Sequence, residues 1–304
     1  MKIFVIGYKG FIGSNLLAFL NEKGLDVSVY TSTEIREGVN DNNLKSFFNF
    51  SSLLPKFEKS IVINCSGNGS VPTSIINPCL DFEANVSFTQ LLLEAIRKAN
   101  TNCTYIHLSS AAVYGNPRIL PVREDSILNP ISPYGYHKVL SENLCRQYAE
   151  LYGIQSIVLR PFSVYGPGLK KQLIWDVHEK FFQSDKKETI EFFGTGNETR
   201  DFIFIQDLCQ MVELLINQAG YLSNFEVFNV SNEEEIKIKT IIEIIAIKFE
   251  DKPFIFSGNS REGDPNNWKG DNSKVKQLGY SCKFSLEQGL EAYTNWYLNS
   301  QIDK

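Results

Sequence analysis

The N-terminal stretch Met1-Lys-Ile-Phe-Val-Ile-Gly7-Tyr-Lys-Gly10-Phe-Ile-Gly13-Ser14 decides the fold of this chain. An apolar run leads directly into glycines, and an apolar helical pattern at residues 12–20 follows. This order is typical of a buried parallel strand that turns into a helix. Glycines let the backbone approach a pyrophosphate, and the N–H groups at a helix start receive its negative charge. The stretch therefore predicts a dinucleotide-binding turn made by Gly7, Gly10, Phe11, Ile12 and Gly13.

Apolar strands and helical patterns continue to alternate through the first half of the chain. Further strands are expected at residues 27–30, 61–65, 105–108 and 156–160, with a helix at residues 88–99. Such alternation predicts an α/β fold with a doubly wound parallel sheet and helices on both of its faces.

The pattern becomes looser beyond Gly166-Pro-Gly168. We expect residues 1–165 to form the dinucleotide-binding domain. Residues 166–304 are expected to form mainly a smaller α/β domain for the substrate, with residues from about 201 to 232 returning to the first domain.

Composition and charge exclude several classes of function. The chain has 304 residues, of which 43% are hydrophobic and 21% charged, so it can bury a large core. A net charge of -5 gives no basic field for nucleic acid. The sequence contains no apolar run of transmembrane length and no signal-peptide core, so no membrane partner is expected. Six scattered cysteines and three scattered histidines predict reduced thiols, a cytoplasmic location and no metal site.

The end of the second strand bears on the choice of cofactor. In many NAD sites a carboxylate at this position binds the adenosine ribose. Here the strand runs into Thr31-Ser32-Thr33, and Arg36 follows soon after. Hydroxyl groups and Arg36 could receive a 2′-phosphate, which favours NADP(H). Glu34 keeps NAD(H) open if the loop turns this side chain inward.

A third stretch, Ser132-Pro-Tyr134-Gly-Tyr-His-Lys138, predicts the start of a helix. Ser132 can cap the helix and Pro133 suits its first turn. Tyr134 and Lys138 are four residues apart and so share one face. An ammonium near the phenol would lower the pKa of Tyr134 and prepare it for proton transfer. Taken alone, the pair is more typical of an ordinary exposed helix surface than of a catalytic site.

Several motifs together resemble the extended short-chain dehydrogenase/reductase family, of the type that modifies nucleotide sugars. The resemblance extends from the N-terminus to about Trp296. The motifs, in order, are Gly7-x-x-Gly10-Phe-Ile-Gly13, Ser109-Ser-Ala-Ala-Val-Tyr-Gly115, Tyr134-x-x-x-Lys138, Arg160-Pro-Phe-Ser-Val-Tyr-Gly166, Thr199-Arg-Asp-Phe202 and Arg261-Glu-Gly-Asp264. The resemblance implies a Rossmann domain, a cytoplasmic enzyme and a homodimer formed by helices around residues 88–99 and 134–151.

The resemblance also implies roles for individual residues. Ser110, Tyr134 and Lys138 would be catalytic, and Ser109 is expected to bond to backbone within the turn. Further cofactor contacts would come from Cys65, Ser66, Gly67, Asn85, Pro161 and Val164, in addition to Thr31, Ser32 and Arg36. Substrate contacts would come from Ser110, Ala111, Tyr134, Ser163, Phe193, Arg200, Arg261 and Asp264. Many relatives have Asn where this chain has Ser163.

The residues next to Ser110 separate the reactions that this family catalyses. Dehydratases with the same pattern have Asp-Glu where this chain has Ala111 and Ala112. Loss of such general acid-base groups costs roughly a hundred- to ten-thousand-fold in rate, so dehydration is not expected. The leading prediction is an NAD(P)H-dependent reductase of a nucleotide-linked 4-keto-deoxyhexose in surface-polysaccharide synthesis. The alternatives are a nucleotide-sugar 4-epimerase and a non-enzymatic dinucleotide-sensing regulator.

Overall fold

A parallel six-stranded sheet forms the centre of the larger part of the chain. The computed structural model describes residues 1–37, 54, 59–99, 102–185, 188–259 and 265–302. The strand order is β10-β5-β4-β3-β1-β2, and every neighbouring pair is parallel. These strands are β1 (Lys2–Ile6), β2 (Val27–Tyr30), β3 (Ser60–Asn64), β4 (Cys103–Leu108), β5 (Gln155–Pro161) and β10 (Phe225–Val230). The predicted α/β class with a doubly wound parallel sheet is confirmed.

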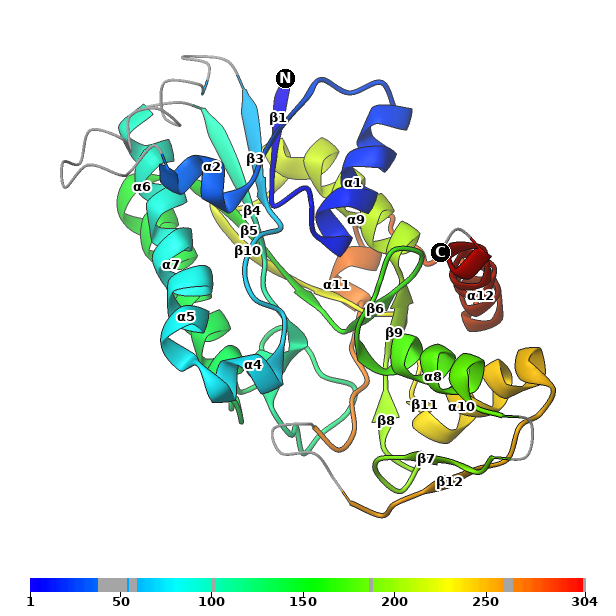
Figure 1. Ribbon diagram of the computed structural model, residues 1–304. Helices are drawn as coiled ribbons and strands as arrows, with labels where there is room; N and C mark the ends of the chain where they lie inside the picture. The colour runs from blue at the N-terminus through cyan, green and yellow to red at the C-terminus, as the bar shows by residue number, and fades with distance from the viewer. Residues whose placement is uncertain (38–53, 55–58, 100–101, 186–187, 260–264, 303–304) are drawn as a thin grey trace.

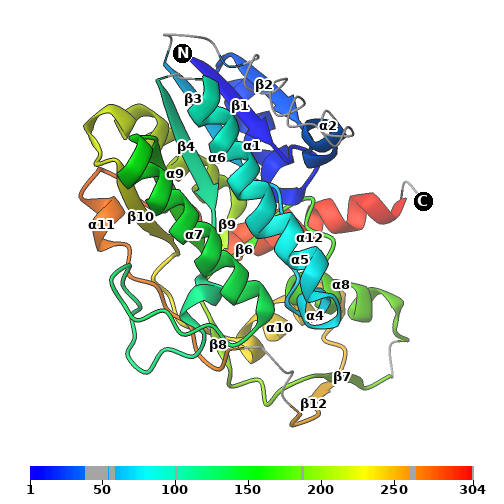
Figure 2. The ribbon, with the colours of Figure 1, turned by 90° about the vertical axis from the view of Figure 1, so that its left-hand side faces the viewer.

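Helices cover both faces of this sheet. Successive side chains of a strand point to opposite faces, so each apolar strand needs a covering layer on both sides. On β1, Ile3 and Val5 pack toward one side, while Phe4 and Ile6 pack toward the other, and all four are fully buried. The first side is covered by α1 (Phe11–Glu22) and α9 (Ile205–Gln218). The opposite side is covered by α6 (Phe88–Ala99) and α7 (Pro133–Tyr152), as Figures 1 and 2 show.

The start and end of α7 follow from its sequence. The Ser132 side chain accepts a hydrogen bond from the Gly135 N–H (3.2 Å), and Pro133 occupies the first turn. Gly153 ends the helix with φ 68°, a left-handed conformation that suits glycine. The predicted helix start at Ser132 is therefore confirmed.

The remaining elements form a smaller group beside the carboxyl end of the sheet (Figure 1). Its helices are α8 (Gln172–Gln183), α10 (Ile238–Ala246) and α12 (Leu286–Ile302). Three strand pairs connect it: β6 (Ser163–Tyr165) with β9 (Phe202–Phe204), β7 (Ile190–Phe192) with β12 (Phe254–Phe256), and β8 (Thr199–Arg200) with β11 (Ile236–Lys237).

Short elements complete the described chain. They are α2 (Ser32–Glu37), α4 (Val71–Ile76), α5 (Pro78–Phe82), η1 (Glu83–Ser87), η2 (Ala111–Tyr114), η3 (Ala219–Tyr221), η4 (Ile247–Phe249) and α11 (Ser273–Lys276).

Elements of the second half of the chain pack against both parts of the fold. β10 lies beside β5 in the main sheet, and α9 packs on α1. One buried apolar cluster continues from β1 through α9 to α8, α10 and α12. The division at residue 165 stays a prediction. Within the described ranges, no helix is long and apolar enough to cross a membrane.

Candidate functional site

Neighbouring strands of the main sheet end level with one another and bring distant segments together. Ile6 pairs with Asn64, Asn64 with His107, and Leu108 with Leu159. The segments after these strands therefore begin at one edge of the sheet, where open α/β sheets bind ligands. Half-buried or buried residues at this edge include the predicted Phe11, Ile12, Cys65, Ser66, Ser110, Ala111, Pro161, Ser163 and Val164.

The glycine turn after β1 is too tight to hold side chains. Gly7 has φ 82°, and a Cβ there would stand 2.7 Å from the Ser66 main-chain nitrogen. A Cβ on Gly13 would overlap the Gly7 carbonyl, which also accepts the Gly10 N–H at 3.0 Å. Gly10 directly precedes α1, and the first turn of α1 contains no acidic side chain. The turn and the helix start thus fit a pyrophosphate.

Asn85 lies below the loop that follows β3. It is part of the π-helix η1, a distortion that often occurs at functional sites. Its Nδ2 donates to the Asp81 carbonyl (3.1 Å), while its buried Oδ1 has no hydrogen-bond partner among the described residues. A Cβ on Gly67, whose φ is 118°, would stand only 2.5 Å from this Oδ1. Asn85 therefore packs directly against the loop at Gly67, where a larger residue would not fit.

The end of β2 bears on the choice of cofactor. The Glu34 side chain folds back onto the strand end, which is the arrangement that keeps NAD(H) open. Its Oε2 accepts the Thr31 N–H at 2.6 Å, while the Glu34 N–H donates to Thr31 Oγ1 at 3.1 Å. Hydrogen bonds to the carboxylate from the Thr31 N–H and from the Thr31 side chain lower the pKa of Glu34 and favour its ionised form. Thr31 and Ser32 are half-buried beside it, and the Arg36 side chain lies outside the described residues.

Tyr134 and Lys138 lie one turn apart on α7, but the ammonium is not aimed at the phenol oxygen. Lys138 Nζ donates to the Leu108 carbonyl (2.9 Å) and stands 5.7 Å from the centre of the Tyr134 ring. Burial raises the pKa of Tyr134 to about 12, although a hydrogen bond with the Ser110 side chain acts in the opposite direction. The predicted lowering of the Tyr134 pKa is therefore wrong for this structure, because desolvation outweighs the hydrogen bond with Ser110 and the Asp81 charge acts in the same direction as burial.

The pKa of Lys138 is lowered, as expected for a buried base. Its side chain is almost fully buried, and burial lowers its pKa to about 8, despite the opposing effects of Asp81 and Glu142. The structure thus brings Ser110, Tyr134 and Lys138 together, with the ammonium fixed against the end of β4.

Contacts that the sequence did not reveal hold α7 in place. The Tyr134 N–H donates to the hydroxyl of Ser74 on α4 at 3.1 Å. A Cβ on Gly135 would stand 2.7 Å from the Ala112 carbonyl, so α7 and η2 approach closely at a glycine. His137 Nδ1 lies 2.6 Å from the buried carboxylate of Asp81. The catalytic candidates therefore rest on α4, α5 and η2, which only tertiary structure brings near.

A buried ionic network below Ser110 was also missed. The sequence predicts that the Ser109 side chain bonds to backbone. Instead, its hydroxyl donates to Glu142 Oε1 at 2.5 Å. The Glu142 carboxylate also accepts two hydrogen bonds from Arg160, at 3.0 and 2.7 Å. Arg160 in turn donates to the Tyr114 hydroxyl at 2.8 Å. Tyr134, Lys138 and Glu142 follow one another at intervals of four residues and so lie on one face of α7. This spacing is the sequence signal that could have revealed Glu142.

The predicted substrate residues are only partly described. Arg200 Nη1 donates to the carbonyls of Thr199 (2.9 Å) and Asn266 (3.3 Å), and the guanidinium lies 5.7 Å from the centre of the Trp268 ring. Phe193 follows β7 and is 55% exposed. The two remaining candidates, Arg261 and Asp264, lie outside the described residues. Within the described part of the chain, no group of three or more His, Cys, Asp or Glu side chains could hold a metal ion.

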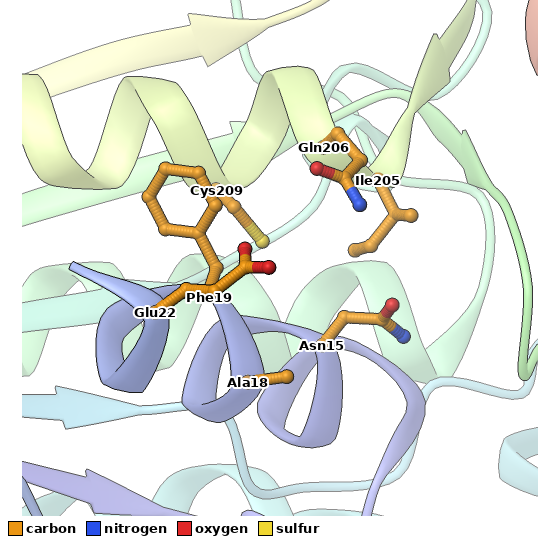
Figure 3. Close-up of a pocket in the computed structure, with 7 residues that line it drawn as sticks. All are labelled: Asn15, Ala18, Phe19, Glu22, Ile205, Gln206 and Cys209. Carbon is orange, nitrogen blue, oxygen red and sulfur yellow. The ribbon is translucent and has the colours of Figure 1, made fainter.

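A cavity of about 320 Å³ lies elsewhere, between α1 and α9 (Figure 3). Its lining consists of Asn15, Ala18, Phe19, Glu22, Ile205, Gln206 and Cys209. None of the predicted site residues is among them. We therefore place the candidate site at the sheet edge and not in this cavity.

Known proteins resemble this chain over nearly its whole length. The sequence profile described as "NAD dependent epimerase/dehydratase family" matches residues 3–231. The UDP-glucose 4-epimerase of Mycolicibacterium smegmatis is 27% identical, and the match covers 98% of this chain and 99% of that protein.

Two solved structures share the fold. A UDP-glucose 4-epimerase from Thermotoga maritima, solved with UDP-glucose, is 25% identical with a TM-score of 0.85; the match covers 99% of this chain and 100% of that one. A UDP-glucuronic acid 4-epimerase from Bacillus cereus, solved with a UDP-linked fluorinated sugar and NAD, is 26% identical with a TM-score of 0.84 and the same coverage.

Proposed function

Because this chain belongs to the NAD-dependent epimerase/dehydratase family, we propose that it is a nucleotide-sugar 4-epimerase that uses NAD. The family expected from the motifs is thus confirmed. One observation carries the proposal: Tyr134 lies beside Ser110 and above Lys138, while the adjacent positions hold Ala111 and Ala112. The site has groups to move one proton at a sugar hydroxyl and none there to eliminate water. Relatives named as 4-epimerases support this reading over the reductase.

In the proposed reaction, Tyr134 takes the proton of the sugar 4-hydroxyl and later returns it. The Ser110 hydroxyl would form a hydrogen bond with the same sugar oxygen and keep this oxygen next to the phenol. When bound, the oxidised nicotinamide supplies a hydride acceptor and a positive charge. That positive charge favours the phenolate that Tyr134 must form, while Lys138 would hold the nicotinamide ribose. Ser110 and Tyr134 would hold the keto oxygen while the sugar presents its other face, which would allow the carbon to be inverted.

We propose that NAD, rather than the NADP favoured by the sequence, is the cofactor. The Glu34 carboxylate at the end of β2 would repel a 2′-phosphate, whereas it can accept a hydrogen bond from a ribose hydroxyl. Gly7, Gly10 and Gly13 would surround the pyrophosphate, with Phe11 and Ile12 beside it. Further contacts are proposed from Thr31, Ser32, Cys65, Ser66, Gly67, Asn85, Tyr134, Lys138, Pro161 and Val164.

For the substrate, we propose a nucleoside diphosphate held from the β8 side. Arg200 can grip phosphate oxygens with its guanidinium, and Phe193 is exposed near the same part of the chain. Ser110, Ala111, Tyr134 and Ser163 would face the sugar. Roles for Arg261 and Asp264 stay predictions, as do the cytoplasmic location and the link to surface polysaccharide.

The outer face of α7 supports the proposed homodimer. Three of its apolar side chains, Tyr136, Leu140 and Leu151, are between 43% and 66% exposed. Exposed apolar groups on one helix often mark a subunit contact. Light scattering of the purified chain would give its mass in solution, and a monomer at micromolar concentration would contradict the dimer.

The proposed function is tested with UDP-glucose and the purified full-length chain. We expect conversion to the 4-epimer without added cofactor, and NAD released from the denatured protein. Chromatography of the sugar nucleotides and of the released dinucleotide measures both. If the chain instead consumes NADPH with a nucleotide-linked 4-keto-deoxyhexose and leaves UDP-glucose unchanged, it is a reductase and the epimerase proposal is wrong.

A further inference from the structure

Asp201 is a fully buried carboxylate that the proposed reaction does not use. It stands between β8 and β9, directly after Arg200. Neighbouring residues in an extended chain point to opposite sides, and Arg200 is accordingly half-buried while Asp201 is not exposed at all. An acid inside the protein is costly, because burial penalises its charged form; here burial raises its pKa to about 7. Such a residue calls for an explanation.

The contacts of Asp201 join segments that are far apart in sequence. Its Oδ1 accepts the N–H of Asn232 at 2.6 Å, and its Oδ2 accepts the N–H of Gly270 at 2.9 Å. Its own carbonyl accepts the N–H of Ser163 at 2.9 Å. One residue thus connects the strand that carries Arg200 with the segment after β10, the segment around Gly270 and the start of β6.

The segment at residues 266–270 in turn determines where Arg200 lies. The Trp268 N–H donates to the Thr199 carbonyl (3.2 Å), and the Arg200 guanidinium lies over the Trp268 ring. Arg200 also donates to the Asn266 carbonyl. At the other end of the segment there is no room to shift, since a Cβ on Gly270 would stand 2.5 Å from Ser231 Oγ.

Asp207 offers a comparison within the same molecule. It too is buried, and its carboxylate accepts two backbone N–H groups, those of Lys283 (2.8 Å) and Phe284 (3.3 Å). Burial raises its pKa as well. Asp207, however, connects α9 to the segment before α12, which contributes no proposed substrate residue. The same chemistry therefore occurs once beside Arg200 and once away from it.

We propose that Asp201 is a positioning residue for the nucleoside diphosphate of the substrate: by holding residues 266–270 and 232 against β8, it fixes the Arg200 guanidinium for phosphate. The inference rests on the proposed function, since it concerns the same nucleotide-sugar site. Asp201 itself touches neither substrate nor cofactor, and acts through Arg200 and Trp268.

The experiment compares Asp201→Asn with Asp207→Asn in the full-length chain. An amide keeps the size of the carboxylate but turns a donor toward one of the two N–H groups. For Asp201→Asn we expect the KM for UDP-glucose, and the Kd of UDP measured by calorimetry, to rise about tenfold, consistent with one unsatisfied buried group. The kcat and the bound NAD should change less than twofold. For Asp207→Asn we expect a lower melting temperature with KM and the Kd of UDP within twofold of the wild type.

The outcomes distinguish a failure of the proposed function from a failure of the positioning role of Asp201. If the wild type neither binds UDP nor converts UDP-glucose, the proposed function fails and this inference with it. If the wild type does both and Asp201→Asn binds UDP equally well, or if the two variants weaken UDP alike, only the positioning role is refuted. Should Asp201→Asn fail to fold, Gly270→Ala presses the same segment against Ser231; an unchanged Kd for UDP in that variant overturns the proposal.

Discussion

The two sides of the proposed site are built in different ways. On the cofactor side, the glycine turn and the start of α7 are made by local contacts: Gly10 bonds to Gly7, and Gly135 to Ser132. On the substrate side, Asp201 bonds to residues 31 and 69 positions away. Local contacts leave a pattern in the sequence, because turn and cap residues must stand at fixed spacing. Long-range contacts leave none, so the partners of Asp201 are visible only in the folded chain.

The strongest test of the local side is Tyr134→Phe. Removal of the phenol oxygen should lower kcat by roughly a hundred- to ten-thousand-fold, because no other side chain is proposed to carry the sugar proton. NAD binding should be nearly unchanged, since the ring still fills its buried position. Steady-state conversion of UDP-glucose and calorimetry with NAD measure the two effects.

Tyr136→Phe is the matched control, because Tyr136 is 57% exposed on the outer face of the same helix. It should retain kcat within twofold. Activity retained in Tyr134→Phe, or lost equally in both variants, would remove Tyr134 from its catalytic role.

These two tyrosines also show what the sequence could and could not predict. The spacing correctly separates Tyr134 from Tyr136, and it identifies Lys138 as the residue one turn away. It cannot predict that the ammonium bonds to Leu108, or that burial raises the pKa of the phenol, because both depend on β4 and η2 packing against α7. Glu34 is a similar case, since its reach back to Thr31 depends on the side-chain rotamer.

The long-range contacts of the site can be tested at the ion pair of Glu142 with Arg160. Both side chains are about 95% buried or more, and the two residues belong to α7 and β5. Arg160→Met would leave the Glu142 carboxylate buried without its partner, which costs about 3–5 kcal/mol of unfolding free energy. Urea unfolding measures this loss.

The double variant Glu142→Leu with Arg160→Met removes both charges and should recover part of the stability. Arg97→Met, which breaks an exposed pair with Glu94 on one helix turn, should leave stability nearly unchanged. A single Arg160→Met variant as stable as wild type would show that the network contributes little to the fold.

The smallest effect we predict is a pH dependence that distinguishes Lys138 from Tyr134. Burial lowers the pKa of Lys138 to about 8 and raises that of Tyr134 to about 12. A base is charged below its pKa, so the Lys138 ammonium is present below about pH 8 and is lost as the pH rises through this value. If activity needs that charge, kcat/KM for UDP-glucose should fall above pH 8, about tenfold per unit. Lys138→Arg, in which the charge persists to much higher pH, should lose this fall even if its absolute rate is lower. A wild-type rate that instead climbs steadily from pH 8 to 10 would mean that ionisation of the phenol governs the reaction, and that the bound cofactor, not Lys138, supplies the decisive charge.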